Sequence, residues 1–240
     1  MKRWNVMLGA VVVVFALFQA SNANSQTRSQ VYGSDLDRQT MTAYFQGDVG
    51  MMTVESDAVN SKQTLNTTSW EFGGYAGEAR KLGFAFQATD NDVDFALNKS
   101  HMETSWRDAM VQGRIGWVYP RITAGLTRIQ IDQDGEEVVN LYGPSVGAGC
   151  GVYVPLWDRI VVSADYNVHQ TQNAQNSTDH DVSMGKRKDG QVAVSVDVTD
   201  RMIDLMFGFR HRSYDLTVDG QNNNETTQGA FIGTRIGFYF

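Results

Sequence analysis

Three residues near the C-terminal end of the chain have the types that serine hydrolases use. His211 and Ser213 flank Arg212, and Glu225 lies on the next predicted strand. A histidine that takes the serine proton, and that a carboxylate orients, activates the hydroxyl for attack on an ester or amide. A His-x-Ser spacing also arises by chance in a chain with four histidines and many serines. Two interpretations remain open, a hydrolytic site and a rim histidine beside a solvated serine, and we favour the second.

Paired carboxylates are a second candidate. Asp90-Asn91-Asp92 brings together two side chains of a kind that can activate water or hold a divalent cation. Asp179 and Asp181 repeat this spacing, yet nothing in the sequence fixes a ligand geometry. Cys150 is the only cysteine, which excludes an internal disulfide and a metal site built on several thiolates. We therefore predict no metal site and no cofactor.

The remaining charged residues mostly alternate with apolar residues, and successive side chains of a strand point to opposite faces. One face of each predicted strand is apolar and the other carries the charges. The charged set is Asp48, Glu71, Asp108, Arg114, Asp165, Asp197, Asp204, Arg210, Arg212 and Arg235. In a closed sheet these residues share one lumen, where acids and arginines neutralise one another as a plug. A narrow hydrophilic pore is the alternative, because Gly147, Gly149 and Gly151 leave space on the same face.

Alternation with a period of two recurs in ten segments, from Met41–Met51 to Ala230–Phe240. Long polar loops are predicted near residues 55–66, 90–105, 132–140, 170–190 and 219–226, with short turns near residues 78, 119, 156 and 200. This strict alternation of long and short connections is typical of an antiparallel up-and-down transmembrane β-barrel. We predict an all-β barrel of ten strands, with eight as the alternative because the Val192–Val198 strand is short. Ile129 and Ile131 leave the phase of the residues before them, which predicts a bulge.

The N-terminal segment has the features of an export signal. Lys2 and Arg3 precede an apolar block, Val6–Phe18. This block is too short to cross the hydrocarbon core of a bilayer, which needs a helix of roughly 20 residues. Ser21-Asn22-Ala23 offers small residues for cleavage. We predict a signal peptide over Met1–Ala23, a periplasmic lead-in over residues 24–39 and the barrel over residues 40–240; an uncleaved anchor helix is the alternative.

Charge excludes one class of partner. Without Lys2 and Arg3, 27 acidic residues face 18 Lys and Arg, a balance of −9. Nucleic-acid binding needs a basic surface, so no nucleic acid is expected. A soluble β-sandwich with solvated charged faces is the structural alternative to a membrane barrel. Tryptophans near predicted strand ends favour the barrel, although the parity of Trp106 places it on the inward face.

The last stretch of the chain, Ala230–Phe240, is an alternating strand that stops on an aromatic residue. Its apolar face holds Ile232, Ile236, Phe238 and Phe240. This ending resembles the C-terminal assembly signal of bacterial outer-membrane barrels, and in pattern nearly the whole chain resembles a small integral outer-membrane β-barrel of Gram-negative bacteria. The resemblance implies an outer-membrane location, contact with outer-membrane lipid and lipopolysaccharide, and insertion by periplasmic chaperones and the barrel-assembly machinery. We expect a monomer.

Two enzyme families with barrel folds test the catalytic candidates. Omptin proteases use an Asp-x-Asp pair, which Asp90 and Asp92 resemble, together with an Asp-x-His pair, which this chain lacks. Lipid A deacylases use a His-x-Ser with a following Glu, which His211, Ser213 and Glu225 resemble, but their serine is followed by Asn and here by Tyr214. We therefore expect a non-enzymatic barrel with a structural or surface-interaction role in the cell envelope. A narrow porin-like channel is the first alternative and a lipid A-modifying hydrolase the second.

Overall fold

The computed structural model describes residues 41–58, 60–76, 82–95, 99–157, 159–172, 175–176, 178, 181–199 and 202–239. Within these ranges the chain is all β. The strands are β1 (Met41–Ser56), β2 (Ser61–Ala76), β3 (Leu82–Phe95), β4 (Ser100–Gly113), β5 (Val118–Gln133), β6 (Glu136–Trp157), β7 (Ile160–Thr171), β8 (Gln175–Asn176), β9 (Val182–Asp197), β10 (Ile203–Val218) and β11 (Gln221–Tyr239). Among the same residues no helix is long and apolar enough to cross a membrane. The predicted signal peptide, the lead-in and Phe240 lie outside the described residues.

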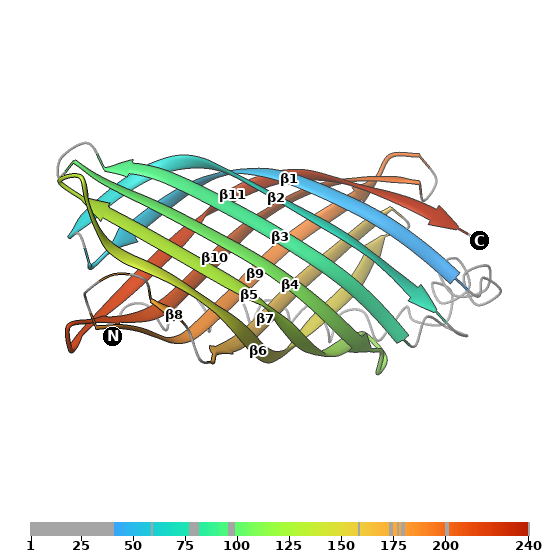
Figure 1. Cartoon of the computed structure of the whole chain (residues 1–240). Coiled ribbons are helices and arrows are strands. Elements are labelled where there is room, and N and C mark those ends of the chain that lie inside the picture. The colour runs from blue at the N-terminus through green and yellow to red at the C-terminus, as the bar shows by residue number, and fades with distance from the viewer. Residues whose placement is uncertain are drawn as a thin grey trace, which may run out of the picture.

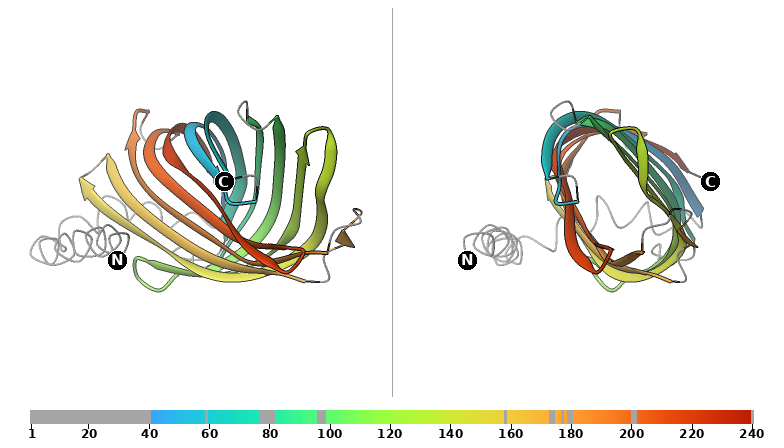
Figure 2. Two further views of the ribbon diagram at one scale, coloured as in Figure 1. Left: turned by 90° about the vertical axis from the view of Figure 1, so that its left-hand side faces the viewer. Right: turned by 60° about the vertical axis from the view of Figure 1, so that its left-hand side comes forward.

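Ten of these strands close into one antiparallel barrel (Figure 1), and Figure 2 shows the resulting tube from two sides. Strands that follow one another in the chain are neighbours in the sheet, with β9 next to β7 because β8 is a two-residue addition beside β6. The last strand, β11, pairs with β10 on one side and with β1 on the other, from Thr42 opposite Tyr239 to Ser56 opposite Glu225. The prediction of a ten-stranded up-and-down barrel is confirmed.

The strands are longer than predicted, and the connections predicted as long loops are correspondingly shorter. The segments predicted as loops at residues 55–66 and 90–105 consist mostly of strand, since β2 begins at Ser61, β3 continues to Phe95 and β4 begins at Ser100. These extensions were missed because the polar residues change faces along the strand. Near one end of the barrel the outward side chains are apolar, and near the other end they are polar.

We call the end of the barrel that holds Met41 and Tyr239 the proximal end, and the opposite, hairpin end the distal end. In the proximal half the outward side chains are large and apolar. They form a band that we call the belt: Phe45, Val49, Met51, Trp70, Phe72, Leu82, Phe84, Phe86, Val111, Ile122, Leu126, Val146, Tyr166, Val192, Val194, Leu205, Phe207, Phe209, Ile232, Ile236 and Phe238. Ile122 is 72% exposed. A continuous apolar band of this kind requires an apolar surrounding.

In the distal half the arrangement is reversed. Acidic, basic and hydroxyl side chains face outward, and apolar side chains fill the inside. The inward set, which we call the distal core, is Val54, Val93, Phe95, Met102, Trp106, Ile129, Ile131, Val139, Leu141, Val182, Met184, Tyr214 and Leu216. None of these residues is more than 8% exposed. The inside of the distal half therefore resembles the core of a soluble protein.

The ring of strands divides around the distal core. Pairing between β2 and β3 stops at Thr68 opposite Asp90, and pairing between β6 and β7 stops at Ser145 opposite Thr171. Beyond these points β3 to β6 form one sheet, and β9, β10, β11, β1 and β2 form another. The distal core has members from both sheets, so the distal half is a β-sandwich continuous with the barrel. The two packed sheets of the distal half thus belong to one closed barrel.

The predicted bulge before Ile129 is wrong. The register between β4 and β5 is continuous from Gln133 to Arg121, and a register shift with β6 occurs only after Ile131. The alternation of inward and outward side chains continues unbroken through Ile129. Ile129 points inward because the inward side chains of β5 are apolar in the distal half. A bulge does occur in β9, where Gly185 and Lys186 together oppose Asp215 of β10.

Candidate functional site

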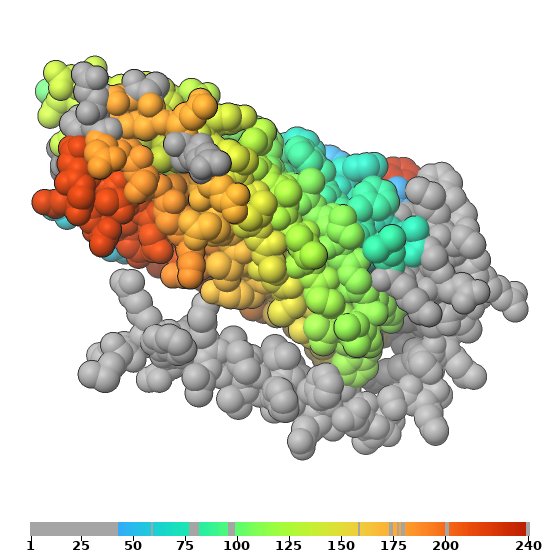
Figure 3. Space-filling view, turned by 60° about the horizontal axis from the view of Figure 1, so that its bottom comes forward, coloured from blue at the N-terminus to red at the C-terminus, as the bar shows by residue number. Residues whose placement is uncertain are grey.

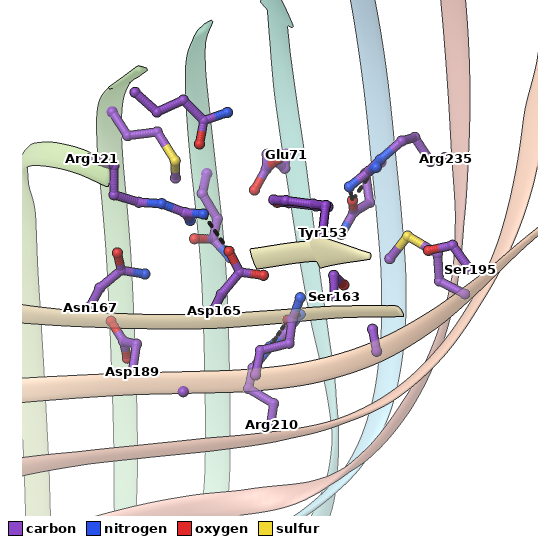
Figure 4. Close-up of a pocket in the computed structure, with 18 of the residues that line it drawn as sticks. Glu71, Arg121, Tyr153, Ser163, Asp165, Asn167, Asp189, Ser195, Arg210 and Arg235 are labelled. Atoms are coloured by element: carbon purple, nitrogen blue, oxygen red, sulfur yellow. Dashed lines mark hydrogen bonds and ion pairs between the residues drawn. The ribbon is translucent and has the colours of Figure 1, made fainter. Parts of the chain in front are cut away.

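The lumen of the proximal half contains the largest group of buried charged residues in the described structure. Residues from most of the strands line a cavity of about 50 Å³, room for a few water molecules. Figure 4 shows Arg121, Arg210 and Arg235 pointing into this space together with Glu71, Asp165 and Asp189. Charges of both signs are therefore brought together in one small volume.

One cluster joins β1, β2, β9 and β10 around Arg210. The two terminal nitrogens of Arg210 donate to the two carboxylate oxygens of Asp48 at 3.0 Å each. The same guanidinium donates to Ser69 Oγ at 2.6 Å and to Gln191 Oε1 at 2.8 Å, and the Ser69 hydroxyl donates to Asp48 at 2.7 Å. The guanidinium also lies 4.7 Å from the ring centre of Phe231. A two-pronged pair of this kind fixes the geometry as well as neutralising the charge.

A second cluster lies next to the distal core. Arg187 of β9 pairs with Asp108 of β4, donates to Asp189 at 2.9 Å and lies 3.1 Å from the ring nitrogens of His169. Asp189 also pairs with Arg212. The Arg212 guanidinium lies 4.3 Å from the centre of the Trp106 ring, which marks the boundary between the charged lumen and the distal core.

Asp108, His169 and Asp189 offer ligand atoms that lie within 4.8 Å of one another, a grouping that could hold a metal ion. The Arg187 guanidinium, however, contacts all three side chains. A cation already occupies the centre of this grouping, and a metal ion would have to displace it against the repulsion of Arg212. The geometry therefore favours a charge-paired cluster over a metal site.

The proximal mouth of the lumen is filled by aromatic rings. Tyr44, Tyr75, Tyr119 and Tyr153 form a chain with ring centres 6.0, 6.3 and 4.9 Å apart. The Tyr44 hydroxyl donates to Glu71 at 2.6 Å, and Arg235 stacks on the Tyr44 ring at 5.1 Å.

Two arginines complete this end of the lumen. Arg235 donates to Gln46 at 2.8 Å, and Arg121 pairs with Asp165. The inward glycines do not leave an open channel beside them: a Cβ added at Gly151 would lie 2.6 Å from an Asp165 carboxylate oxygen. Side chains from neighbouring strands occupy this space.

The structure places all but one of the predicted lumen charges on the inward face. Asp197 and Asp204 lie opposite each other at the proximal end, and Asp204 also lies opposite Arg235. Arg114 is the exception, because β4 ends at Gly113 and the Arg114 side chain is exposed in the following turn, where its Nε donates to the Gly116 carbonyl at 3.0 Å. The alternating pattern continues to Trp117 in the sequence, which predicts a longer strand than the one that ends at Gly113.

Four important lumen residues were missing from the predicted set. The sequence predicts a tight turn at Val118–Arg121, and strand parity places His169 on the inward face without indicating a charged partner. Arg187 and Asp189 lie in the longest predicted loop, residues 170–190, which is rich in Asn, Gln, Asp and Ser. Without the bulge at Gly185 and Lys186, strand parity would turn these two side chains outward. The parity of Asp189 relative to Val192 was the one signal that could have identified it.

The three hydrolase candidates do not come together. His211 and Ser213 lie on the outer face of β10, whereas Glu225 points into the barrel with no exposed surface and accepts the Ala58 N–H at 3.2 Å. The residue opposite Glu225 is Tyr214, which is inward and buried. Burial raises the pKa of Glu225, which lies in the distal half, to about 7. A carboxylate on the other side of the sheet cannot orient the His211 ring.

The acidic pair at Asp90 and Asp92 lies on the outer face of the distal half. Asp90 forms a two-pronged pair with Arg107 at 2.8 and 2.9 Å. His101 lies 2.9 Å from Asp94 and 3.6 Å from Asp92, and the hydrogen bond to Asp94 raises the pKa of its imidazole. These carboxylates thus have basic partners on their own surface.

The outward parity of the C-terminal strand agrees with the predicted assembly face. Ile232, Ile236 and Phe238 are 48%, 38% and 47% exposed and belong to the belt. An apolar outside around a charged inside is the reverse of a soluble barrel and is the arrangement required in lipid. The fold is that of an outer-membrane β-barrel.

Comparison with known proteins finds similar structures and assigns no activity. No protein-family model and no curated protein sequence matches the chain. Among solved structures it is similar to Neisserial surface protein A, with 16% identity and a TM-score of 0.39 over 82% of this chain and 97% of the other. It is also similar to the outer-membrane protease OmpT from Escherichia coli, with 6% identity and a TM-score of 0.48 over 82% and 97%. An outer-membrane channel from Pseudomonas putida F1 gives 11% identity and a TM-score of 0.49 over 86% and 98%.

Proposed function

We propose that this protein is an integral barrel of the Gram-negative outer membrane that serves as a structural or surface-interaction element of the envelope and does not conduct solutes. The observation that carries the proposal is the distal core, which fills the barrel above a lumen of paired charges. In this proposal the belt lies in the bilayer and the proximal end, where β1 begins and β11 ends, faces the periplasm. The distal sandwich then projects from the cell surface.

Two successive barriers argue against the channel alternative. A hydrated ion entering from the proximal end meets the tyrosine chain and then the pairs around Arg210 and Arg187. Beyond them it meets the distal core, in which Ile129, Leu141 and Leu216 have no exposed surface. Moving a charge through such an apolar layer without a partner is strongly unfavourable. The cavity in this part of the lumen measures about 50 Å³, room for only a few water molecules.

The separation of the catalytic candidates argues against the hydrolase alternative. Ser213 and His211 lack an acid on their own face within the described part of β11, where Thr226 and Gln228 are their neighbours. The projecting outer face, by contrast, carries mixed charges and hydroxyls, which suit contact with polar surface partners. A structural or surface-interaction role is consistent with both features.

Conductance in planar lipid bilayers tests the proposal. The folded wild-type protein should insert, as shown by a heat-modifiable band on a gel, and should give no unitary current steps. A matched variant that opens the barrel, Trp106→Ala with Leu216→Ala, provides the control for detection, because it removes two large side chains from the distal core. Regular current steps from the wild-type protein would contradict the proposal, and the absence of a heat-modifiable band would contradict the barrel itself.

A further inference from the structure

The residues that first suggested a hydrolase belong to a different surface feature. His211 and Ser213 face outward on β10, just distal to the belt residue Phe209. Lys188 of β9 lies directly opposite Ser213, and Lys186 lies two residues further along the same face. These four side chains form a small polar patch at the distal edge of the belt, which we call the boundary patch.

The bulge in β9 creates this patch. On the distal side of the bulge, Val182 and Met184 are inward members of the core; on the proximal side, Arg187 and Asp189 are inward and the two lysines are outward. A regular strand would have turned Lys186 and Lys188 into the distal core, where two ammonium groups without partners would be very unfavourable. The extra residue therefore places two cations on the outer face at one defined level.

Two cations of the distal outer face have acidic partners, whereas Arg128 of β5 donates to the Gln130 side-chain oxygen at 3.1 Å. Lys62 pairs with Glu55 at 3.7 Å, and Arg107 pairs with Asp90. Within the described residues neither Lys186 nor Lys188 forms an ion pair, although Asp215 lies opposite the bulge. Their charge is available to a ligand from outside the chain.

The surface next to the patch is apolar. Val192 and Val194 on β9 are 41% and 39% exposed, and Phe207 and Phe209 on β10 are 48% and 51% exposed. Figure 3 shows the orange atoms of the β9 region beside the red atoms of the strands that follow it. A ligand that satisfies both surfaces has an anionic head beside a hydrophobic tail.

We propose that the boundary patch binds the phosphate group of a membrane lipid, with the two lysines contacting the phosphate and the belt residues of β9 and β10 contacting the acyl chains. This inference rests on the proposed membrane location and names a partner for the outer face. Lysine is a compact charge with three donors that suits a phosphate oxygen. The Ser213 hydroxyl and the His211 ring offer further hydrogen bonds, so the His-x-Ser segment acts in recognition and no covalent step is needed.

Native mass spectrometry of the full chain folded in dodecyl maltoside micelles tests the assignment. The probes are dimyristoyl phosphatidic acid, dimyristoyl phosphatidylcholine with the same chains, and inorganic phosphate. The test variant is Lys186→Gln with Lys188→Gln. The control is Lys62→Gln with Arg128→Gln, which removes the same charge from the outer face elsewhere.

The wild-type protein should retain phosphatidic acid in preference to phosphatidylcholine. The test variant should bind phosphatidic acid roughly thirtyfold more weakly, the order expected for two lysines at an anionic lipid surface. The control variant should bind like the wild type. If the test variant does not fold, Ser213→Ala with His211→Gln provides a second variant, with an expected loss of about fivefold, the low end for two neutral hydrogen bonds.

Equal binding of the two lipids, equal loss in the control variant, or no loss in either test variant would overturn the assignment. Displacement of the lipid by an equal concentration of inorganic phosphate would overturn it in favour of a simple anion site. These outcomes all concern a folded protein with a heat-modifiable band. Failure of the wild-type protein to fold in micelles would instead count against the proposed membrane function.

Discussion

The proximal and distal halves of this barrel are built from the same strands and have opposite faces. Along β10, Leu205 and Phe207 face outward into the belt, whereas Tyr214 and Leu216 face inward into the distal core. The backbone ladder continues through both halves. The difference follows from the surroundings. Apolar side chains can face lipid, whereas in water they are stable only when they are buried inside the protein.

The two halves are stabilised by different interactions. The belt side chains contribute little hydrophobic free energy to folding, since they face an apolar surrounding. The proximal half therefore depends on the closed backbone ladder and the paired charges in its lumen. The distal half depends on apolar burial. Trp106 joins the two, with its ring near Tyr214 of the distal core and under the Arg212 guanidinium.

The largest effect should come from breaking a charge pair in the proximal lumen. Arg210→Met leaves the buried Asp48 carboxylate with the Ser69 hydroxyl as its remaining partner, and we expect a loss of about 3–5 kcal/mol in the free energy of unfolding. Urea titration of the protein in lipid vesicles, followed by tryptophan fluorescence, measures it. Asp48→Asn with Arg210→Met removes both charges and should recover most of the loss. A single variant as stable as the wild type would show that the pair does not hold this half together.

A matched pair of leucines on β10 tests the difference between the halves directly. Leu216→Ala removes a fully buried side chain from the distal core and should lower the free energy of unfolding by about 2–5 kcal/mol. Leu205→Ala makes the same chemical change in the belt, where Leu205 is 36% exposed, and should have a much smaller effect because lipid tails fill the space. Equal losses in the two variants, measured by the same urea titration, would contradict the division into two solvent environments.

A smaller effect is expected from the pH dependence of Glu225. Its pKa is raised by burial from 4.5 in the unfolded chain to about 7, so the folded state holds its proton more tightly. The corresponding stability is complete below pH 4.5, falls as the pH rises towards 7 and is lost above it, with a total change of at most about 3 kcal/mol. Glu225→Gln should remove this slope from a series of urea titrations between pH 4.5 and 8. Glu103→Gln, on the outer face of β4, should retain it; a wild-type slope in the Glu225→Gln variant would assign the titration to another group.

Much of the barrel could be predicted because successive side chains of a strand point to opposite faces. Where the two faces meet different surroundings, apolar and polar residue types therefore alternate along the sequence. Phe45 and Val49, or Ile232 and Ile236, indicate the belt without any knowledge of their neighbours. The same rule failed in the distal half, because it assumes that the apolar face of a strand points outward along its whole length. Ile129 and Ile131 then resembled a bulge, and Asp90, Asp92 and Asp94 resembled a loop, although both sets continue regular strands.

The candidate site was less predictable, since its partners come from distant strands. Parity placed Asp48, Asp108 and Arg210 on one face, but it could not pair Asp108 with Arg187, which lies 79 residues away. The β9 bulge shifts the parity of Arg187 through backbone geometry that leaves little trace in the residue types. The sequence left Glu225 as a candidate partner of His211 and Ser213, because the face to which it points depends on the register of β11.

The amino-acid sequence by itself determined that the chain forms ten antiparallel strands with an apolar face, since that information is local and repeats every two residues. The tertiary structure alone decided which solvent each stretch of strand meets, which acid neutralises which arginine, and where the bulge turns Lys186 and Lys188 outward. These outcomes depend on closure of the sheet, which fixes the level of every strand against its neighbours. Only in the closed barrel do the inward side chains of the same strands form a charged lumen in the proximal half and an apolar core in the distal half.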